Sequence, residues 1–144
     1  MDLETLRQVA EEFIPFNKFL GIEVASIEPG KVRLEIPFRD VLIGDPMKPA
    51  MHGGVLSALA DTTGGLALWS AIDDPRRLVS TIDLRIDYIR PGRLERIAAE
   101  GTIVRIGGRV GVADIRLFHP AKPEETVATG KGVYAINAVR AAKT

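Results

Sequence analysis

The chain of 144 residues has no cysteine and only two histidines, His52 and His119, which lie far apart in the sequence. Disulfides, thiolate nucleophiles and cysteine-type zinc sites are therefore excluded, and two separated histidines do not form a zinc-binding constellation. The formal net charge is zero, and no run of like charges is present. This charge pattern argues against a broad nucleic-acid-binding surface and against binding to an anionic membrane.

Long apolar runs are also lacking, since no stretch approaches the roughly 20 residues that a membrane-spanning helix needs. The N-terminal segment Met1-Asp2-Leu3-Glu4 is acidic and has no signal-peptide pattern. We therefore expect a cytoplasmic protein. With 46% hydrophobic residues the chain can build a core, and its length fits one domain covering residues 1–144.

The hydrophobic periodicity predicts a mixture of helices and strands. Apolar positions with helical spacing predict an N-terminal helix over about residues 3–16, and the core of the domain is expected over about 20–138. A long helix is predicted from Gly53 to about Ile72, after an irregular loop over residues 40–51. Alternating segments predict strands over 22–27, 31–38, 80–88, 97–106, 110–119 and 126–136. This order indicates an α+β fold, in which a curled antiparallel sheet of five to six strands wraps around the long helix.

The long helix has one apolar face and one acid. At 100° per residue, the face expected against the sheet carries Val55, Leu56, Leu59, Ala60, Thr63, Leu66 and Ala67. Asp61 is the only charged residue between Gly53 and Ile72, and it points away from this face. Its neighbours on that side are small or apolar: Ser57, Ala58, Gly64, Gly65 and Leu68.

An isolated carboxylate among small residues needs an explanation, because burial of an unpaired charge is costly. One hypothesis is that another chain or a ligand packs closely against Asp61. The alternative is a purely structural acid that is hydrogen-bonded to a hydroxyl group, such as that of Ser57 or Thr81.

The start of the same helix is a second candidate site. Two glycines, Gly53 and Gly54, follow His52, and backbone N–H groups at a helix start are open to an anionic or polarised ligand atom. His52 and Asp61 are nine residues apart, which corresponds to roughly 13 Å along a helix. If both act on one substrate, two helices must pack antiparallel about a two-fold axis, so we expect a homodimer with composite sites.

The segment Met51-His52-Gly53-Gly54-Val55-Leu56-Ser57-Ala58-Leu59-Ala60-Asp61 resembles the signature of hotdog-fold acyl-CoA thioesterases of the PaaI-like, phenylacetate-pathway branch. The strand segment Ser80–Pro91, which ends in Arg-Pro, is similar to the third strand of that family. The resemblance covers about residues 15–138. It implies the hotdog fold and hydrolysis of acyl-CoA to a carboxylic acid and CoA, with no cofactor, since CoA is part of the substrate.

The resemblance also implies roles for individual residues. The backbone N–H of Gly53 would polarise the thioester carbonyl, as an oxyanion hole does. Asp61 of the partner subunit would be the general base or the nucleophile. Thr81 would position the water or the acid, and His52 would orient the loop or contact the thioester. Gly54 and Ser57 are expected to line the substrate site, and the assembly is expected to be a dimer of dimers.

The chain departs from the family in the loop before His52. Relatives often place an asparagine or glutamine about six residues before the histidine, whereas no amide occurs here from Phe38 to His52. Asp45 is the candidate replacement. Arg90, Arg93 and Arg109 are candidates for binding the CoA phosphates, since guanidinium groups suit phosphate oxygens. Exposed arginines at the ends of the sheet are the simpler interpretation.

Two further functions stay open on the sequence. The same fold could bind or sense acyl-CoA without cleaving it, which the missing loop amide favours and the intact Asp61 disfavours. A hydratase or dehydratase acting on hydroxyacyl thioesters would need a catalytic histidine paired with an acid in a different pattern.

Overall fold

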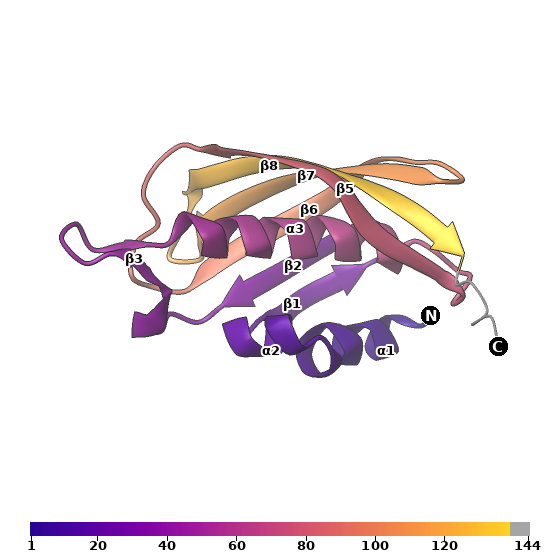
Figure 1. The fold of residues 1–144 in the computed structure, drawn as a ribbon, viewed down its shortest axis with the longest axis horizontal. Coiled ribbons are helices and arrows are strands. Elements are labelled where there is room, and N and C mark those ends of the chain that lie inside the picture. The colour runs from indigo at the N-terminus through magenta and orange to yellow at the C-terminus, as the bar shows by residue number, and fades with distance from the viewer. Residues whose placement is uncertain (139–144) are drawn as a thin grey trace.

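Six strands form one antiparallel sheet in the computed structural model, which describes residues 1–138. The last six residues of the predicted domain, 139–144, lie outside the described residues. In spatial order the strands are β1 (Glu23–Glu28), β2 (Lys31–Ile36), β6 (Ile97–Ile106), β7 (Val110–His119), β8 (Lys122–Ala138) and β5 (Arg77–Tyr88). The helix α3 (Gly53–Ser70) lies along the concave side of the sheet, which curls around it (Figure 1). The predicted α+β architecture is confirmed.

The predicted sheet-facing side of α3 is also confirmed. All seven of its residues are buried, and Leu59, Ala60, Thr63 and Ala67 are fully inaccessible to solvent. The hydroxyl of Thr63 donates to the carbonyl of Leu59 at 2.6 Å, so this buried polar group is satisfied within the helix. A fully buried leucine side chain contributes about 1.5–3 kcal/mol to stability, so this face anchors α3 to the sheet.

Two glycines in the middle of α3 have different surroundings. A Cβ atom at Gly64 would lie 2.2 Å from the hydroxyl oxygen of Tyr134, whereas a Cβ atom at Gly65 would meet nothing closer than 3.5 Å. Tyr134 on β8 is buried, and Gly132 two residues before it also makes room for its ring. Glycine inside a helix costs about 1 kcal/mol relative to alanine, and the close approach of Tyr134 explains this cost at Gly64.

The space beside Gly64 is therefore filled by Tyr134 of the same chain. Leu68, which the helical wheel placed on the same open side, is also fully buried, together with Ala113 and Tyr134. The curl of the sheet brings β7 and β8 over this part of α3, which a pattern of hydrophobic residues along one helix cannot show.

Strand β5 contains a bulge that changes which side chains face α3. The strand pairs with β8 along its whole length, but the register shifts between Thr81 and Asp83. Ile82 is the extra residue, and its side chain is 57% exposed. Strict alternation would place Thr81 opposite to Leu84 and Ile86, whereas the bulge lets all three face the helix. The hydroxyl of Thr81 is thereby directed toward Asp61.

The N-terminal segment differs from the single helix that was predicted over 3–16. It contains α1 (Leu3–Gln8), a π-helical turn η1 (Val9–Phe13) and α2 (Pro15–Leu20). The residue before a proline avoids the helical region, and Ile14 is extended at φ −88° and ψ 108°. Pro15 then starts α2, because proline suits the first position of a helix. Gly21, in the left-handed region at φ 73°, ends it.

Other boundaries shift by a few residues. The predicted irregular loop contains a 3-10 turn, η2 (Asp40–Leu42), and a short hairpin of β3 (Ile43–Asp45) and β4 (Ala50–Met51). The predicted connection at 120–125 is a tight turn, since His119 already pairs with Lys122. Within residues 1–138, no helix is both long enough and apolar enough to cross a membrane.

Candidate functional site

The start of α3 presents one free backbone donor. His52 is the N-cap residue, and its Nδ1 accepts a hydrogen bond from the N–H of Gly54 at 2.8 Å. The next N–H, that of Val55, donates to the carbonyl of His52 at 3.0 Å. No acceptor within residues 1–138 takes the N–H of Gly53. Of the two glycines, Gly53 is thus the one whose N–H is available to a ligand.

The cap also determines the state of the histidine. A ring nitrogen that accepts a hydrogen bond carries no proton, so the proton of His52 is on Nε2. His52 and Gly54 line an apolar pocket of about 330 Å³ together with Phe16 and Phe19. Its Nε2–H is therefore a donor beside an apolar surface.

Tyr88, the last residue of β5, fixes the backbone around Gly53. Its hydroxyl donates to the carbonyl of Gly53 at 3.0 Å and also forms a hydrogen bond with the hydroxyl of Ser57. A Cβ atom at Gly53 would lie 3.3 Å from the ring of Tyr88. Strand β5 therefore holds the first turn of α3 in place, and the predicted substrate-site residue Ser57 is bonded within its own chain.

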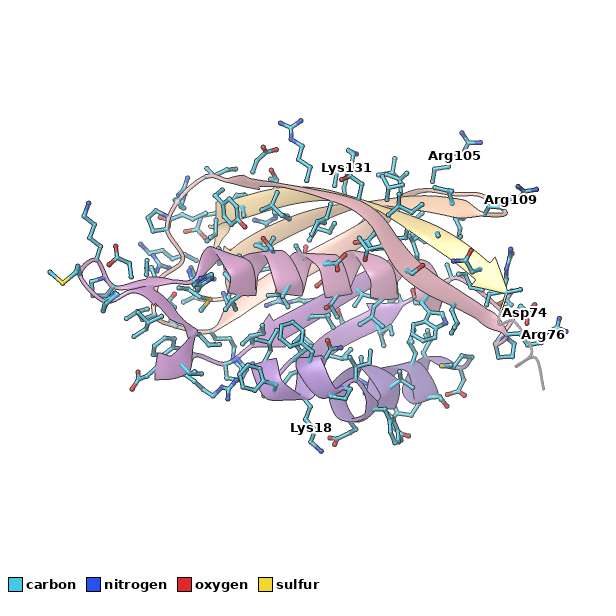
Figure 2. All side chains as sticks on the ribbon, viewed as in Figure 1. Lys18, Asp74, Arg76, Arg105, Arg109 and Lys131 are labelled. Carbon is cyan, nitrogen blue, oxygen red and sulfur yellow. The ribbon has the colours of Figure 1, made fainter. Side chains whose placement is uncertain are left out.

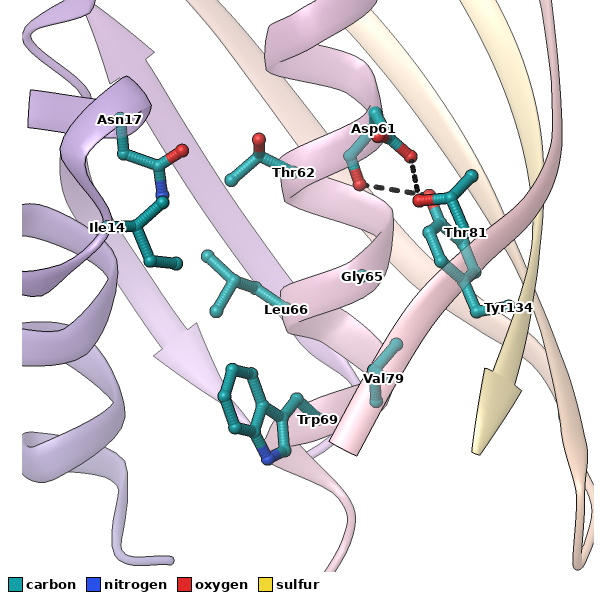
Figure 3. Close-up of a pocket in the computed structure, with 10 residues that line it drawn as sticks. All are labelled: Ile14, Asn17, Asp61, Thr62, Gly65, Leu66, Trp69, Val79, Thr81 and Tyr134. Atoms are coloured by element: carbon teal, nitrogen blue, oxygen red, sulfur yellow. Dashed lines mark hydrogen bonds between the residues drawn. The ribbon is translucent and has the colours of Figure 1, made fainter. Parts of the chain in front are cut away.

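Asp61 lies near the middle of α3 and lines a separate pocket (Figure 3). Its carboxylate oxygen Oδ1 accepts from the hydroxyl of Thr81 at 2.8 Å. The hydroxyl of Tyr134 donates to the backbone carbonyl of Asp61 at 3.0 Å. Burial, and secondarily the charge of Asp61, raise the pKa of the Tyr134 phenol, so this donor stays protonated.

If Asp61 were a purely structural acid, it would be expected to accept a hydrogen bond from a hydroxyl group, and the bond from Thr81 meets this expectation. It leaves Oδ2 without a donor among residues 1–138. A half-buried carboxylate that is fixed through one oxygen and open at the other can accept a proton from water or attack an electrophile.

The pocket beside Asp61 has a volume of about 190 Å³. Thr81 and Tyr134 lie on the same wall as Asp61, while Ile14 and Asn17 from the N-terminal segment close the opposite side (Figure 3). Between them the lining residues are Thr62, Gly65, Leu66, Trp69 and Val79. This space is apolar apart from the carboxylate and a few hydroxyl and amide groups.

A cluster of cations lies near the start of α3. Arg90 borders a pocket of about 330 Å³ together with Gly53 and Tyr88. The side chains of Arg90, Arg93 and Lys122 all approach Glu125, at 3.7, 3.6 and 3.7 Å. Arg93 also pairs with Glu95 at 3.0 Å. Three cations around two carboxylates leave a positive excess, and such exposed pairs exchange partners at little cost.

Two other predicted residues lie apart from these groups. Asp45 is exposed, and its Oδ1 accepts from the N–H groups of Met47 at 2.8 Å and Lys48 at 3.2 Å, so it stabilises its own turn. Arg109 lies in the β6–β7 turn, at the end of the molecule where α3 ends (Figure 2). Within one chain Arg109 lies at the opposite end of α3 from Arg90, which borders the pocket with Gly53 (Figure 2). Among residues 1–138 no hydrogen bond joins Asp45 to His52, although the hairpin packs Gly44 against His52.

The two candidate groups are separated along one helix. Gly53 and Asp61 are eight residues apart on α3, which is roughly 12 Å. The carboxylate of Asp61 is directed to β5, which is an edge strand of the sheet. Unpaired edges are templates for another strand, and the outward-facing Leu78 and Ile82 on β5 are 44% and 57% exposed. A second copy can thus approach at the side of the molecule where both groups lie.

No group of three or more metal-ligating side chains occurs in the part of the chain that the structure describes. His119 is buried, and both of its ring nitrogens bond to backbone atoms, namely the carbonyl of Arg96 and the N–H of Arg93, each at 2.9 Å. It holds the 90–96 loop, and with it the arginine cluster, against β7.

Sequence reasoning missed the two tyrosines that support the site. The alternation of residues 80–88 does not indicate the bonds of Tyr88 to Gly53 and Ser57, and the strand pattern does not indicate the bond of Tyr134 to Asp61. A tyrosine at the end of an alternating strand is a weak signal on its own. The glycines Gly64 and Gly132 were the better signal for Tyr134, because each marks a close approach by another residue.

Comparisons with known proteins indicate the family of the chain. A family model described as Thioesterase superfamily matches residues 49–125. The chain is 33% identical over 131 residues to the medium/long-chain acyl-CoA thioesterase YigI of Escherichia coli K12, which covers 81% of this chain and 84% of YigI. The Halobacterium salinarum protein named "Putative esterase VNG_1336C" is 41% identical over 125 residues, or 82% of each chain. A solved structure from Shewanella oneidensis, described as related to the thioesterase superfamily, has a TM-score of 0.83 at 30% identity and covers 94% of this chain and 95% of its own.

Proposed function

Because this chain belongs to the thioesterase superfamily, we propose that it hydrolyses acyl-CoA thioesters to a free carboxylic acid and CoA. The observation that carries this proposal is the pairing of a free Gly53 N–H at the start of α3 with a fixed, half-open Asp61 carboxylate. One is suited to stabilise a developing oxyanion, and the other is suited to activate water.

The thioester carbonyl oxygen would accept a hydrogen bond from the N–H of Gly53, aided by the positive end of the α3 dipole. Asp61 Oδ2 would take a proton from water, whose oxygen attacks the carbonyl carbon to give a tetrahedral oxyanion. Collapse of this species breaks the C–S bond and leaves the acid, while the proton taken up by Asp61 passes to the departing sulfur, which gives CoA and restores the carboxylate. Asp61 acting as the nucleophile, through a mixed anhydride, needs the same free oxygen. The bond from Thr81 would hold the carboxylate in position in either case.

The site we propose is composite. One subunit contributes His52 and Gly53, and the partner subunit contributes an aspartate equivalent to Asp61 of this chain. The roughly 12 Å between the two groups on one helix supports this arrangement, as does the exposed β5 edge beside Asp61. We propose a two-fold homodimer, with association of two dimers into a tetramer. No metal or cofactor takes part in the proposed reaction.

The cluster of Arg90, Arg93 and Lys122 is our proposed contact for the CoA phosphates, since Arg90 borders the pocket that contains Gly53 and the other two cations share Glu125 with it. Replacing Arg90 and Arg93 together with alanine should raise KM for an acyl-CoA about tenfold or more, because charge-assisted hydrogen bonds contribute about 1.5–3 kcal/mol. The value of kcat should change little.

The control substrate is the thioester of the same acyl group with N-acetylcysteamine, which has no phosphate. The KM of the double variant for this substrate should equal that of the wild type. Arg105→Ala, a loss of the same charge at the far hairpin (Figure 2), serves as the control variant. An equal rise in KM for both substrates would show that the arginines act on the fold and do not bind phosphate.

The function itself is tested with a panel of acyl-CoAs from acetyl to palmitoyl, together with benzoyl-CoA and phenylacetyl-CoA, by measuring free thiol release. Turnover of at least one substrate well above the background rate is expected. Binding without turnover across the whole panel would instead support the second candidate, an acyl-CoA-binding or sensing module. The observation that favours this alternative is the loop before His52, which has no amide and whose Asp45 is bonded to its own turn.

A further inference from the structure

The glycine at position 65 is not required by the fold of the chain. Its neighbour Gly64 must be glycine because the Tyr134 hydroxyl lies where a side chain would begin. At Gly65 an added Cβ would meet only the ring of Tyr134, at 3.5 and 3.8 Å, which are ordinary contact distances. Alanine would therefore fit at position 65 and would favour the helix. Something other than packing within this chain accounts for the glycine.

Gly65 borders the pocket that contains Asp61. It lies one helical turn after Asp61, on the same side of α3, between the carboxylate and the indole of Trp69 (Figure 3). The remaining walls near it are the side chains of Ile14, Leu66 and Val79. A methyl group at position 65 would point into this space and reduce its volume.

The composition of these walls indicates what the pocket holds. Apolar surface lines most of it, and the carboxylate lies at one end. If Asp61 acts on the carbonyl carbon of a thioester, the acyl chain attached to that carbon begins beside Asp61 and has this apolar space in front of it. A dry protein cavity of about 150 Å³ is known to hold benzene, so the 190 Å³ found here suits about six to eight carbon atoms.

We propose that this pocket is the acyl-binding pocket, that Gly65 sets its width and Trp69 forms its end wall, and that it selects apolar acyl groups of about six to eight carbons. The inference rests on the proposed function, because it takes the group next to Asp61 to be the acyl part of a thioester. It adds the class of acyl group and two specificity-determining residues.

Trp69 offers a readout that does not depend on catalysis. It is the sole tryptophan of the chain, so the fluorescence of the protein reports on this wall. The probes are non-hydrolysable S-alkyl-CoA thioethers with methyl, hexyl, octyl and dodecyl chains. The hexyl and octyl probes should shift or quench Trp69 emission in a saturable manner, whereas the methyl probe should bind without changing it.

Hydrolysis by variants supplies the second readout. Gly65→Ala should lower kcat/KM for octanoyl-CoA about tenfold or more, leave kcat/KM for acetyl-CoA within about twofold, and raise the melting temperature by a few degrees. Trp69→Leu should move the preference toward decanoyl-CoA and dodecanoyl-CoA. Gly108→Ala is the matched control, because the same methyl group meets nothing within 4 Å at that β6–β7 turn, so it should leave the chain-length profile unchanged.

The outcomes separate this inference from the proposed function. The inference would be overturned if Gly65→Ala had the wild-type chain-length profile and no thioether probe changed the fluorescence of Trp69. The proposed hydrolase function would be unaffected by that result. Absence of thiol release from every acyl-CoA, with a saturable Trp69 response to the octyl probe, would overturn the hydrolase and retain the acyl-binding pocket.

Discussion

Asp61→Asn is expected to lower kcat for acyl-CoA hydrolysis by about 10²–10⁴-fold, the usual contribution of a general base. The asparagine side chain retains an oxygen that can accept from Thr81, as Asp61 Oδ1 does at 2.8 Å. The bond from Tyr134 goes to the backbone carbonyl and is unaffected. The fold should therefore persist, while the group that takes the proton from water is lost.

The measurement is steady-state thiol release with the preferred acyl-CoA, accompanied by thermal melting. Asp61→Ala is the companion variant, since it removes the Thr81 contact as well and should be equally inactive. A purely structural Asp61 makes the opposite prediction, because Asn would then preserve both the hydrogen bond and the activity. Wild-type rates in Asp61→Asn would thus contradict the catalytic role.

Gly53→Pro is expected to lower kcat by about 10²–10³-fold, the loss typical of removing one oxyanion-hole donor. Proline deletes the N–H of residue 53 and adds a ring, whose Cβ atom would approach Tyr88. Gly53 is the first residue of α3, a position that proline favours, and no acceptor within residues 1–138 uses its N–H. His52 has φ −60° and ψ 130°, an extended conformation that suits a residue before proline.

Gly53→Ala is the matched control for this substitution. It adds the same Cβ atom, which would lie 3.3 Å from the ring of Tyr88, but it keeps the N–H. We expect Gly53→Ala to retain most of the wild-type kcat. If alanine and proline reduce kcat equally, contact with Tyr88 would explain the loss and the N–H would have no role.

Hydrophobic periodicity and capping preferences predicted those features that depend on residues close together in the sequence. The bounds of β6 and β7 agree with the observed strands, and the seven-residue buried face of α3 follows from helical periodicity. The placement of His52, Gly53 and Gly54 at the helix start follows from glycine and capping preferences. Each of these depends on interactions within a few residues of the chain.

What could not be predicted depends on distant residues or on a single inserted residue. Tyr134 bonds to Asp61 across 73 positions of the sequence, and only the curl of the sheet brings them together. The bulge at Ile82 turns Thr81 toward α3, and the alternation of apolar and polar residues in this strand does not reveal the bulge. The bonds from Met47 and Lys48 to Asp45 depend on the conformation of a loop, which its composition does not determine.

The composite site is tested most directly by a heterodimer of Gly53→Pro and Asp61→Asn subunits. The two chains are co-expressed with different affinity tags, and the mixed dimer is isolated with both tags in turn. In a composite arrangement one of its two sites has both defects and the other has neither, so about half of the wild-type kcat should return. A site formed within one chain would leave both sites defective, and activity no higher than that of either parent variant would contradict the account.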